Sequence, residues 1–276
     1  MSELPFFLKK ILHPSSRCDG TLVKIKDPVA ALTPYIMKTR VEGAVYLRVE
    51  IDVTNAFALI EKLSREGVDI HLFHILMTAF LRVLVEKKKM NRFVVNKRLF
   101  QHNDLSQSFV IKKDFSEEGD ESVAKIYFSP EDKLLEVSEK IISKVDRLRK
   151  EKKNESNVLF RLGAGSHLFL TLLEFSLRQL NKYGLLLKSY IELDPLFASV
   201  FVANLGSLRL SAPYHHLYEW GTVSTFIVIG KVRATPEGKK TVNLAVTLDE
   251  RIGDGFYFAS ALNLLQEYVE NPERLL

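Results

Sequence analysis

The sequence has a single cysteine, Cys18, in 276 residues. One cysteine excludes an internal disulfide, and scarce cysteine favours a reducing compartment, so we expect a cytoplasmic protein. A lone cysteine near a terminus is more often incidental than a nucleophile. The first residues also lack the long apolar run with a small-residue cleavage site that defines a secretory signal peptide. Secretion is therefore not expected.

Sequence signals for nucleic-acid binding are missing as well. There is no zinc-finger spacing, no aromatic RNA-binding motif and no tail rich in lysine and arginine, so we expect no nucleic-acid partner. The net charge of +5 still fits an anionic ligand such as coenzyme A or a lipid surface. The hydrophobic content of 46% over 276 residues is enough for one large core or two small ones.

The most informative stretch lies near the C-terminus. Residues 244–248 alternate apolar and small or polar side chains, which is the period of a strand with one buried face. Asp249, Glu250 and Arg251 follow at once, and Gly253-Asp254-Gly255 then leads into an apolar helix. Charged side chains at the end of a buried strand indicate a site, because their desolvation needs a functional or ion-pair reason.

The run D-E-R-I-G-D-G at 249–255 resembles the D-H-R-x-x-D-G signature of the 2-oxo acid dehydrogenase acyltransferase catalytic domains. This family belongs to the chloramphenicol-acetyltransferase-like superfamily. Asp249, Arg251, Asp254 and Gly255 match the signature, but Glu250 occupies the place of its histidine. In the family that histidine is the general base, which takes a proton from the attacking thiol or hydroxyl.

A second segment, V-A-N-L-G-S-L at 202–208, resembles the family's V-S-N-L-G-S-L, which borders the acyl-transfer site. In the family the serine donates a hydrogen bond to the oxyanion of the tetrahedral intermediate. Ala203 stands at that position and cannot donate. Loss of one oxyanion donor typically costs about a hundred- to a thousandfold in rate. The resemblance therefore argues against the family's standard mechanism.

The resemblance covers about residues 17–276 and implies an α/β fold, a two-layer sandwich of a mixed, largely antiparallel sheet and packed helices. We expect residues 1–40, broken by four prolines, to form an irregular arm, and 41–276 to form one acyltransferase-type domain. No lipoyl-type D-K-A hairpin segment is present, so we expect a divergent stand-alone member. Family members are typically trimers with sites between subunits, which implies a homotrimer.

The pattern predicts individual elements with their boundaries. We expect a strand over 43–53, a helix from Thr54 to Gly67, a helix over about 70–86 and a hairpin that turns at Asn96-Lys97. Ser129 is predicted to cap a helix whose first position is Pro130. Strands are predicted over 221–232 and 241–248, and a closing helix over 255–269.

The missing histidine leaves several candidates for the base. His215 and His216, in a loop rich in aromatic residues, are one pair, although plain packing explains them equally well. Glu250 is another if burial raises its pKa. It could equally be an inert ion-pair partner of Arg251 or of an arginine across a subunit interface. Asp254 is implied to organise the site through an ion pair.

Substrate contacts are expected from Asn204, Gly206 and Arg251. His71 and His74 lie one helical turn apart, but without a third ligand a structural role is favoured and no metal is expected. We therefore expect an acyltransferase with altered machinery that uses acyl-coenzyme A or a carrier thioester as co-substrate and holds no tight cofactor. The alternative is a catalytically inactive trimer that binds acyl ligands or partners.

Residues 162–190 form the most apolar stretch and predict a helix that ends at Gly184. Its Glu174, Arg178 and Lys182 make it too short and too charged to span a bilayer. We favour a core helix that covers the sheet. Two alternatives stay open, a peripheral contact with a membrane surface and the wall of an acyl tunnel.

Overall fold

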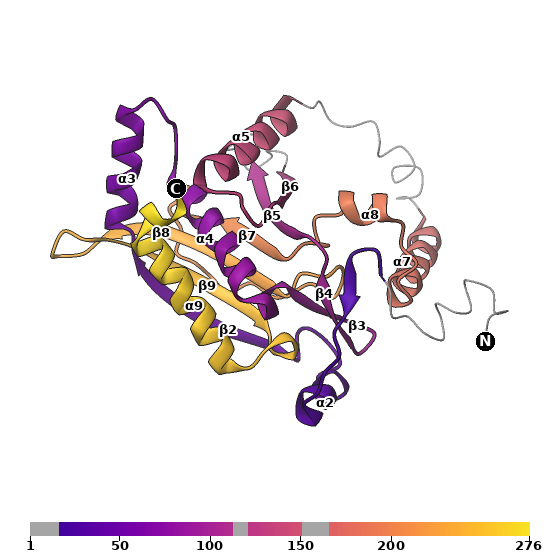
Figure 1. The fold of residues 1–276 in the computed structure, drawn as a ribbon. Helices are drawn as coiled ribbons and strands as arrows, with labels where there is room; N and C mark the ends of the chain where they lie inside the picture. The colour runs from indigo at the N-terminus through magenta and orange to yellow at the C-terminus, as the bar shows by residue number, and fades with distance from the viewer. Residues whose placement is uncertain (1–16, 113–120, 151–165) are drawn as a thin grey trace.

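The computed structural model describes residues 17–112, 121–150 and 166–276. At its centre lies a six-stranded sheet in the order β2-β9-β8-β7-β5-β6 (Figure 1). β7 is parallel to both of its neighbours, and the other pairs are antiparallel. The strands are β2 (Ala44–Asp52), β5 (Leu105–Lys112), β6 (Glu121–Phe128), β7 (Val200–Asn204), β8 (Thr225–Ala234) and β9 (Lys240–Asp249). The expected mixed, largely antiparallel sheet is confirmed.

Helices cover one face of this sheet (Figure 1). Strand alternation sends Ile227 and Ile229 of β8 toward the main core under the helices, and Phe226 and Val228 toward the opposite face. The opposite face is covered by apolar side chains of the irregular segment after β7, among them Leu217. The covering helices are α3 (Thr54–Arg65), α4 (Leu72–Glu86), α5 (Leu134–Lys150) and α9 (Gly255–Glu270).

A small sheet packs beside the large one, in the order β1-β4-β3. Its strands are β1 (Gly20–Leu22), β3 (Arg92–Val95) and β4 (Arg98–His102). Asn96 and Lys97 join β3 to β4 with φ of 50° and 60°, the left-handed pair that a two-residue hairpin turn needs. The predicted hairpin is confirmed.

The N-terminal stretch is more ordered than predicted. Besides β1, it contains α2 (Pro28–Ile36). Asp27 caps this helix by accepting a hydrogen bond from the Val29 N–H, and Pro28 occupies the first helical position, where its missing N–H costs nothing. Proline was interpreted as a helix breaker, whereas here it begins one. Residues 1–16 of the expected arm lie outside the described residues.

Ser129 does not cap a helix, which corrects another expectation. The Ser129 N–H donates to the Asp132 carboxylate and its hydroxyl donates to Glu131, so the three residues close a turn of their own. Short polar side chains compete with helical hydrogen bonds in this way. α5 begins only at Leu134.

The apolar stretch around residue 170 forms α7 (His167–Lys182), followed by α8 (Lys188–Leu193). The end of α7 agrees with the prediction, because Gly184 adopts a left-handed φ of 67° just beyond it. The interpretation as a core helix is wrong, since only Asn181 of α7 is buried. No residue of α7 is among the described residues that line the two cavities presented below. Within the described residues no helix is both long and apolar enough to cross a membrane. Residues 162–165 lie outside the described residues.

Two buried histidines are held neutral. The His74 Nδ1 accepts hydrogen bonds from the His71 N–H and the Ser138 hydroxyl, and burial lowers the pKa of His74 to about 4. Burial likewise lowers the pKa of His102 to about 4, beside the ring of Phe93. Among the described residues, no three His, Cys, Asp or Glu side chains gather into a possible metal site. The hydrogen bonds of His74 to His71 and Ser138 therefore give it a structural role.

These depressed pKa values predict acid sensitivity. A histidine with a folded pKa of about 4 and an ordinary value of 6.5 binds its proton preferentially in the unfolded chain, so stability falls as pH drops below 6.5 toward 4. We expect His102 to account for about 1–2 kcal/mol of lost unfolding free energy between about pH 7 and about pH 5. Urea unfolding of His102→Gln at both pH values checks this: the variant should show a smaller pH difference than the wild type. An unchanged difference contradicts it.

Candidate functional site

The end of β9 holds a buried ion pair. Asp249 is fully buried, and its carboxylate accepts three hydrogen bonds from Arg251: from the backbone N–H, from Nε at 2.8 Å and from Nη2 at 2.7 Å. The remaining arm of Arg251 donates to the Met37 carbonyl at 3.3 Å. Arg251 was expected to bind substrate, but its side chain is buried and bonded to Asp249 and Met37. The pair fixes the short turn η4 (Glu250–Ile252).

This geometry corrects two expectations about Glu250, which is neither buried nor paired with Arg251. Arg251 pairs with Asp249, so Glu250 is not its ion-pair partner. The Glu250 side chain is exposed at a groove of about 480 Å³ between β2 and α9, while its N–H donates to the Gly43 carbonyl. Asp254 caps α9 by accepting from the Tyr257 N–H, and that hydrogen bond lowers its pKa. Its other carboxylate oxygen lies 3.6 Å from the Lys89 Nζ in an exposed ion pair.

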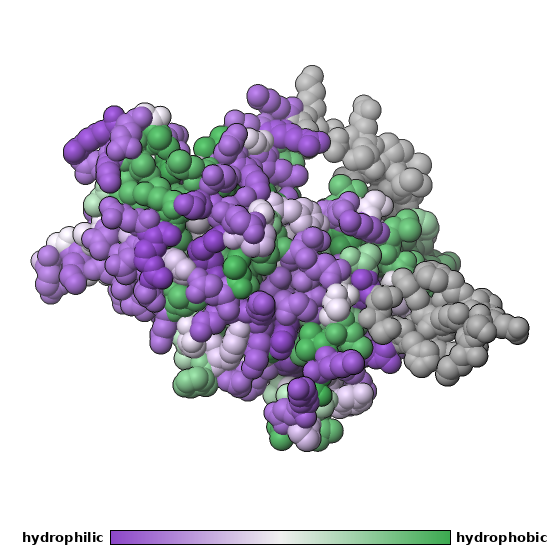
Figure 2. All heavy atoms as spheres, viewed as in Figure 1, coloured by the Kyte–Doolittle hydropathy of each residue, from purple (hydrophilic) through white to green (hydrophobic). Residues whose placement is uncertain are grey.

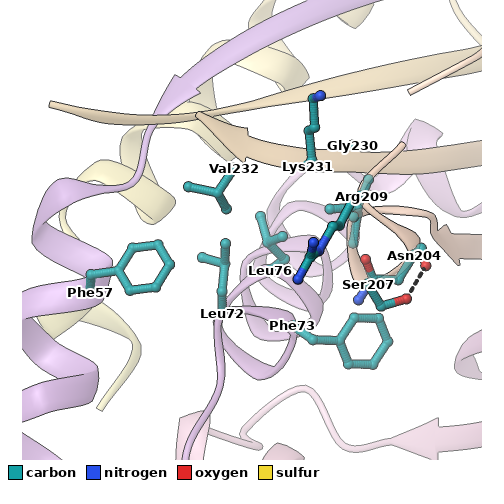
Figure 3. A pocket seen from close by; sticks show the side chains of 12 residues that line it. Phe57, Leu72, Phe73, Leu76, Asn204, Ser207, Arg209, Gly230, Lys231 and Val232 are labelled. Atoms are coloured by element: carbon teal, nitrogen blue, oxygen red, sulfur yellow. Dashed lines mark hydrogen bonds between the residues drawn. The ribbon is translucent and has the colours of Figure 1, made fainter. Parts of the chain in front are cut away.

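A cavity of about 520 Å³ opens at the other end of the sheet (Figure 3). It lies between the helices α3 and α4 on one side and the ends of β7 and β8 on the other. The lining residues are Phe57, Leu72, Phe73, Leu76, Asn204, Gly206, Ser207, Arg209, Ile229, Gly230, Lys231 and Val232. The helices supply an apolar wall, and the strand ends supply polar and cationic groups. We name this space the α4/β8 cavity.

Glycine at two positions lets the strand ends approach each other at the cavity wall. A Cβ on Gly206 would meet the Gly230 carbonyl oxygen at 2.5 Å, and a Cβ on Gly230 would meet the Ala212 backbone nitrogen at 2.8 Å. The chain therefore passes from β7 into the turn η3 (Gly206–Leu208) in close contact with β8. Ser207 lies in this turn, and its hydroxyl donates to the Asn204 carbonyl at 2.9 Å.

Two cations flank the cavity. Arg209 adopts a left-handed φ of 58°. Its guanidinium points toward the apolar side chains of α4 (Figure 3). Lys231 extends outward at the rim. The described residues that line the cavity include no aspartate, glutamate or histidine. This described lining therefore fits a ligand with an apolar body and an anionic end, and it contains no acidic or imidazole side chain that could act as a general base.

Within one chain, the two matched segments lie at opposite ends of the sheet. Asn204 is level with Ile229 of β8, and Ile229 is level with Leu244 of β9. Asp249 lies five residues further along β9, roughly 16 Å at the rise of a strand, and Glu250 follows it. The fold thus separates the acidic turn from the cavity that holds Asn204 and Gly206.

The histidine pair lies on the sheet face that the helices leave free. The His215 ring stacks on Phe226 with 4.0 Å between centroids, and its Nδ1 donates to the His216 carbonyl at 2.7 Å. In a neutral ring this leaves Nε2 as a proton acceptor. Burial lowers the pKa of His215. Neither histidine lines the α4/β8 cavity.

Of the expected contacts, Asn204 and Gly206 do line the cavity. Sequence reasoning missed Ser207, Arg209 and Lys231, as well as the aromatic wall from α3 and α4. Ser207 and Arg209 directly follow the N-L-G run, so their position was a usable signal. Lys231 comes from another strand and becomes a neighbour only through the fold.

Comparisons with known proteins identify the fold. Neither the family models nor the curated protein sequences give a match. A probable dihydrolipoamide acetyltransferase from Listeria monocytogenes aligns over 90% of this chain and 95% of its own, with a TM-score of 0.59 and 15% identity. The 2-oxoacid dehydrogenase complex core of Thermoplasma acidophilum aligns over 91% and 98%, with a TM-score of 0.58 and 14% identity.

A chloramphenicol acetyltransferase aligns over 91% of this chain and 98% of its own, with a TM-score of 0.55 and 13% identity. A further match, the dihydrolipoamide acetyltransferase of Azotobacter vinelandii, has a TM-score of 0.59 and 13% identity. Its structure was determined to examine the catalytic roles of a serine, a histidine and an asparagine. At these identities the likeness concerns the fold: this chain has the chloramphenicol-acetyltransferase-like fold, as predicted.

Proposed function

We propose that this chain is an acyltransferase that binds an acyl thioester of coenzyme A, or of a carrier, in the α4/β8 cavity. The single observation that carries the proposal is the lining of that cavity. Its apolar wall suits an acyl or pantetheine chain, and Arg209 with Lys231 suits phosphate groups. The solved relatives of this fold include acetyltransferases, which supports the same ligand class.

Transfer also needs a base, and the part of the chain that the structure describes places none in the cavity lining. We infer that a second copy supplies it, through Glu250 or through His215 and His216, and that the assembly is the homotrimer implied by the resemblance. The surface beside η4 supports such an assembly, because α2, which contacts η4, exposes a row of apolar side chains. These are Val29 (73% exposed), Leu32 (57%), Tyr35 (55%) and Ile36 (72%).

In this proposal Asn204 and the backbone amides near Gly206 give the remaining oxyanion support in place of the missing serine. The Ser207 hydroxyl lies in the same wall and can turn toward the ligand. Asp254 keeps α9, and with it the turn, in place. No tight cofactor is required, and the single Cys18 fits a cytoplasmic location.

A second candidate is a catalytically silent trimer that binds acyl ligands or partners. It is favoured by one observation, the solvent exposure of Glu250 together with a cavity lining that has no ionisable acid or imidazole. Thiol release from a panel of short- and long-chain acyl-coenzyme A, with and without acceptors, decides between the two. Turnover supports the enzyme, and binding without turnover supports the silent trimer. If there is neither turnover nor binding, only the assignment of the fold remains.

The cationic rim gives a direct prediction for binding. We expect Arg209→Ala and Lys231→Ala each to weaken acyl-coenzyme A binding about tenfold, because each removes a charge-assisted contact to phosphate. Isothermal titration calorimetry measures this. Arg233→Ala, two residues along β8 and outside the cavity lining, is the matched control.

An acyl-pantetheine thioester without the nucleotide phosphates tests the same assignment from the ligand side. Its affinity should be the same for the wild type and both cavity variants. Equal losses for both ligands would show that the cations do not contact phosphate.

A further inference from the structure

Strand β2 lies at one edge of the six-stranded sheet. Among the described strands it pairs with β9 alone, in an antiparallel ladder from Ala44 opposite Asp249 to Asp52 opposite Thr241. In such a ladder alternate N–H and C=O groups of the edge strand point away from the partner strand. Helix α9 contacts β2, and Figure 2 shows hydrophobic residues between hydrophilic ones where Figure 1 places α9. The open edge of β2 is therefore a place where one more strand can pair.

The groove of about 480 Å³ between β2 and α9 follows this backbone edge, and we name it the β2/α9 groove. Its lining includes Leu47 and Val49, which pack against the main core under the helices, and also Arg48, which points to the opposite face. A space that touches successive residues of a strand runs along the backbone, because successive side chains point to opposite faces. On the other side, Phe258 and Leu262 of α9 give it a buried apolar wall.

The β2/α9 groove has room for a short segment of chain. It extends along α9 from Gly255 to Gln266, roughly 16 Å at the rise of a helix, and along β2 from Val45 to Glu50, roughly 16 Å at the rise of a strand. An extended chain covers this length with about five residues. A stable dimer buries about 800 Å² on each partner, which a groove of this length does not supply. A peptide is therefore a better occupant than a second copy of the chain.

The two ends of the groove are acidic. Glu250 lies at the start of β2, where its N–H donates to the Gly43 carbonyl, and Glu50 lies near the other end. Both glutamate side chains are exposed. The Arg48 guanidinium is turned away, with its Cζ 5.7 Å from the ring centroid of Tyr214. The charge of the groove thus favours a basic group at each end of the occupant.

We propose that the β2/α9 groove binds an extended peptide of about five residues as an added strand, flanked by a basic residue at each end. The main chain of the peptide pairs with the open edge of β2. Its alternate apolar side chains point toward Phe258 and Leu262, and its basic residues lie near Glu250 and Glu50. This binding needs no acyl-coenzyme A, so it is independent of the acyl transfer proposed above.

Fluorescence anisotropy with the full chain tests the proposal from the ligand side. The probe is a fluorescein-labelled peptide of sequence Lys-Val-Thr-Val-Thr-Val-Lys, which should bind saturably. The same peptide with glutamate in place of both lysines should bind about tenfold more weakly or worse at low salt.

Two methylated forms of the probe test the strand pairing itself. One has a methyl group on the backbone nitrogens of the valines, and the other has it on those of the threonines. The N–H groups of the two sets point to opposite sides of an extended chain, so only one set can donate to β2. One methylated peptide should therefore bind about tenfold more weakly or worse, and the other should bind like the parent peptide.

Variants of the protein test the position of the site. Ala259→Trp places a large side chain in the groove from an exposed position of α9 and should weaken binding of the probe about tenfold or more. Glu250→Lys should weaken it about tenfold at low salt. The matched control is Phe256→Ala, which removes an exposed side chain of α9 outside the described groove lining and should bind like the wild type.

Circular dichroism and size-exclusion chromatography of each variant separate loss of folding or assembly from loss of peptide binding. The proposal is overturned if the wild type does not bind the probe, if the two methylated peptides bind equally well, or if folded Ala259→Trp binds like the wild type. It is also overturned if Ala259→Trp changes the oligomeric state, because a second copy would then cover the groove.

Discussion

Asp249→Asn should lower the free energy of unfolding by about 3–5 kcal/mol, the cost of breaking a buried ion pair by removing one partner. The Asp249 side chain is 0% exposed and that of Arg251 is 4% exposed, so water cannot replace the lost carboxylate. Asparagine keeps the shape but directs an N–H₂ group or a neutral oxygen at the guanidinium donors. Arg251 would then be a buried cation without a counter-ion. Urea unfolding monitored by circular dichroism measures the change.

Two further variants test the cause. Glu61→Gln breaks an exposed pair with Arg65 one helical turn away and should cost only about 0.3–0.5 kcal/mol. Asp249→Asn/Arg251→Met removes both charges and should recover part of the loss, because the uncompensated cation is gone. A loss below about 1 kcal/mol for Asp249→Asn would mean that the turn does not depend on the pair.

The architecture around this turn was predictable because its signals are local. Alternating apolar residues predicted β9, and Gly255 followed by an apolar period predicted α9. The same segment supplies both partners of the buried pair, two residues apart. Sequence resemblance fixed the overall fold correctly, since the order of strands and helices is spread over the whole chain.

The predictions that were wrong concern residues where two local preferences compete or where a tertiary contact decides the structure. Pro28 either breaks a helix or begins one, and only the Asp27 cap decides this. Ser129 has the composition of a helix cap, but its bond to Asp132 closes a separate turn. An apolar helical period predicts that one face of a helix is buried, but it does not say what covers that face. The large sheet does not cover α7, in which only Asn181 is buried.

The candidate site was predicted in pieces but not in its arrangement. Asn204 and Gly206, which were predicted to bind substrate, line the cavity, whereas Glu250 lies at the opposite end of the sheet. Residue spacing along the chain cannot reveal this, because β7 and β9 run in opposite directions with β8 between them. The sheet order, and not the sequence motif, decides which groups one copy can bring together.

The identity of the base gives the largest expected effect on activity. If Glu250 takes the proton, Glu250→Gln should lower turnover about a hundred- to ten-thousandfold. Acyl-coenzyme A binding should be unchanged, because glutamine keeps the shape of the side chain and the cations that we assign to the ligand, Arg209 and Lys231, are untouched. His215→Ala/His216→Ala should then retain activity. The reverse pattern assigns the base to the histidine pair, and unchanged turnover in both excludes both candidates. Glu250 is exposed, so glutamine should leave the fold intact.

The separation along the sheet makes a stronger test possible. Asn204→Ala should weaken the cavity half of the site, and Glu250→Gln should disable the other half. If the two halves meet only between copies, a mixed assembly of these two variants contains some junctions with both native groups. For equal mixing in a cyclic oligomer, about a quarter of the junctions are native, so activity should return to about that fraction of the wild type.

The mixing experiment needs the two variants to be unfolded and refolded together, or co-expressed, so that subunits exchange. The control is the double variant Asn204→Ala/Glu250→Gln mixed with itself, which contains no native junction and should stay inactive. A mixture no more active than the better single variant would mean that each chain works alone. In that case Glu250, roughly 16 Å along β9 from the level of Asn204, cannot be the base. β9 runs antiparallel to β7, so Glu250 and Asn204 lie at opposite ends of the sheet. This arrangement allows the experiment to distinguish a site shared between copies from a catalytically silent fold.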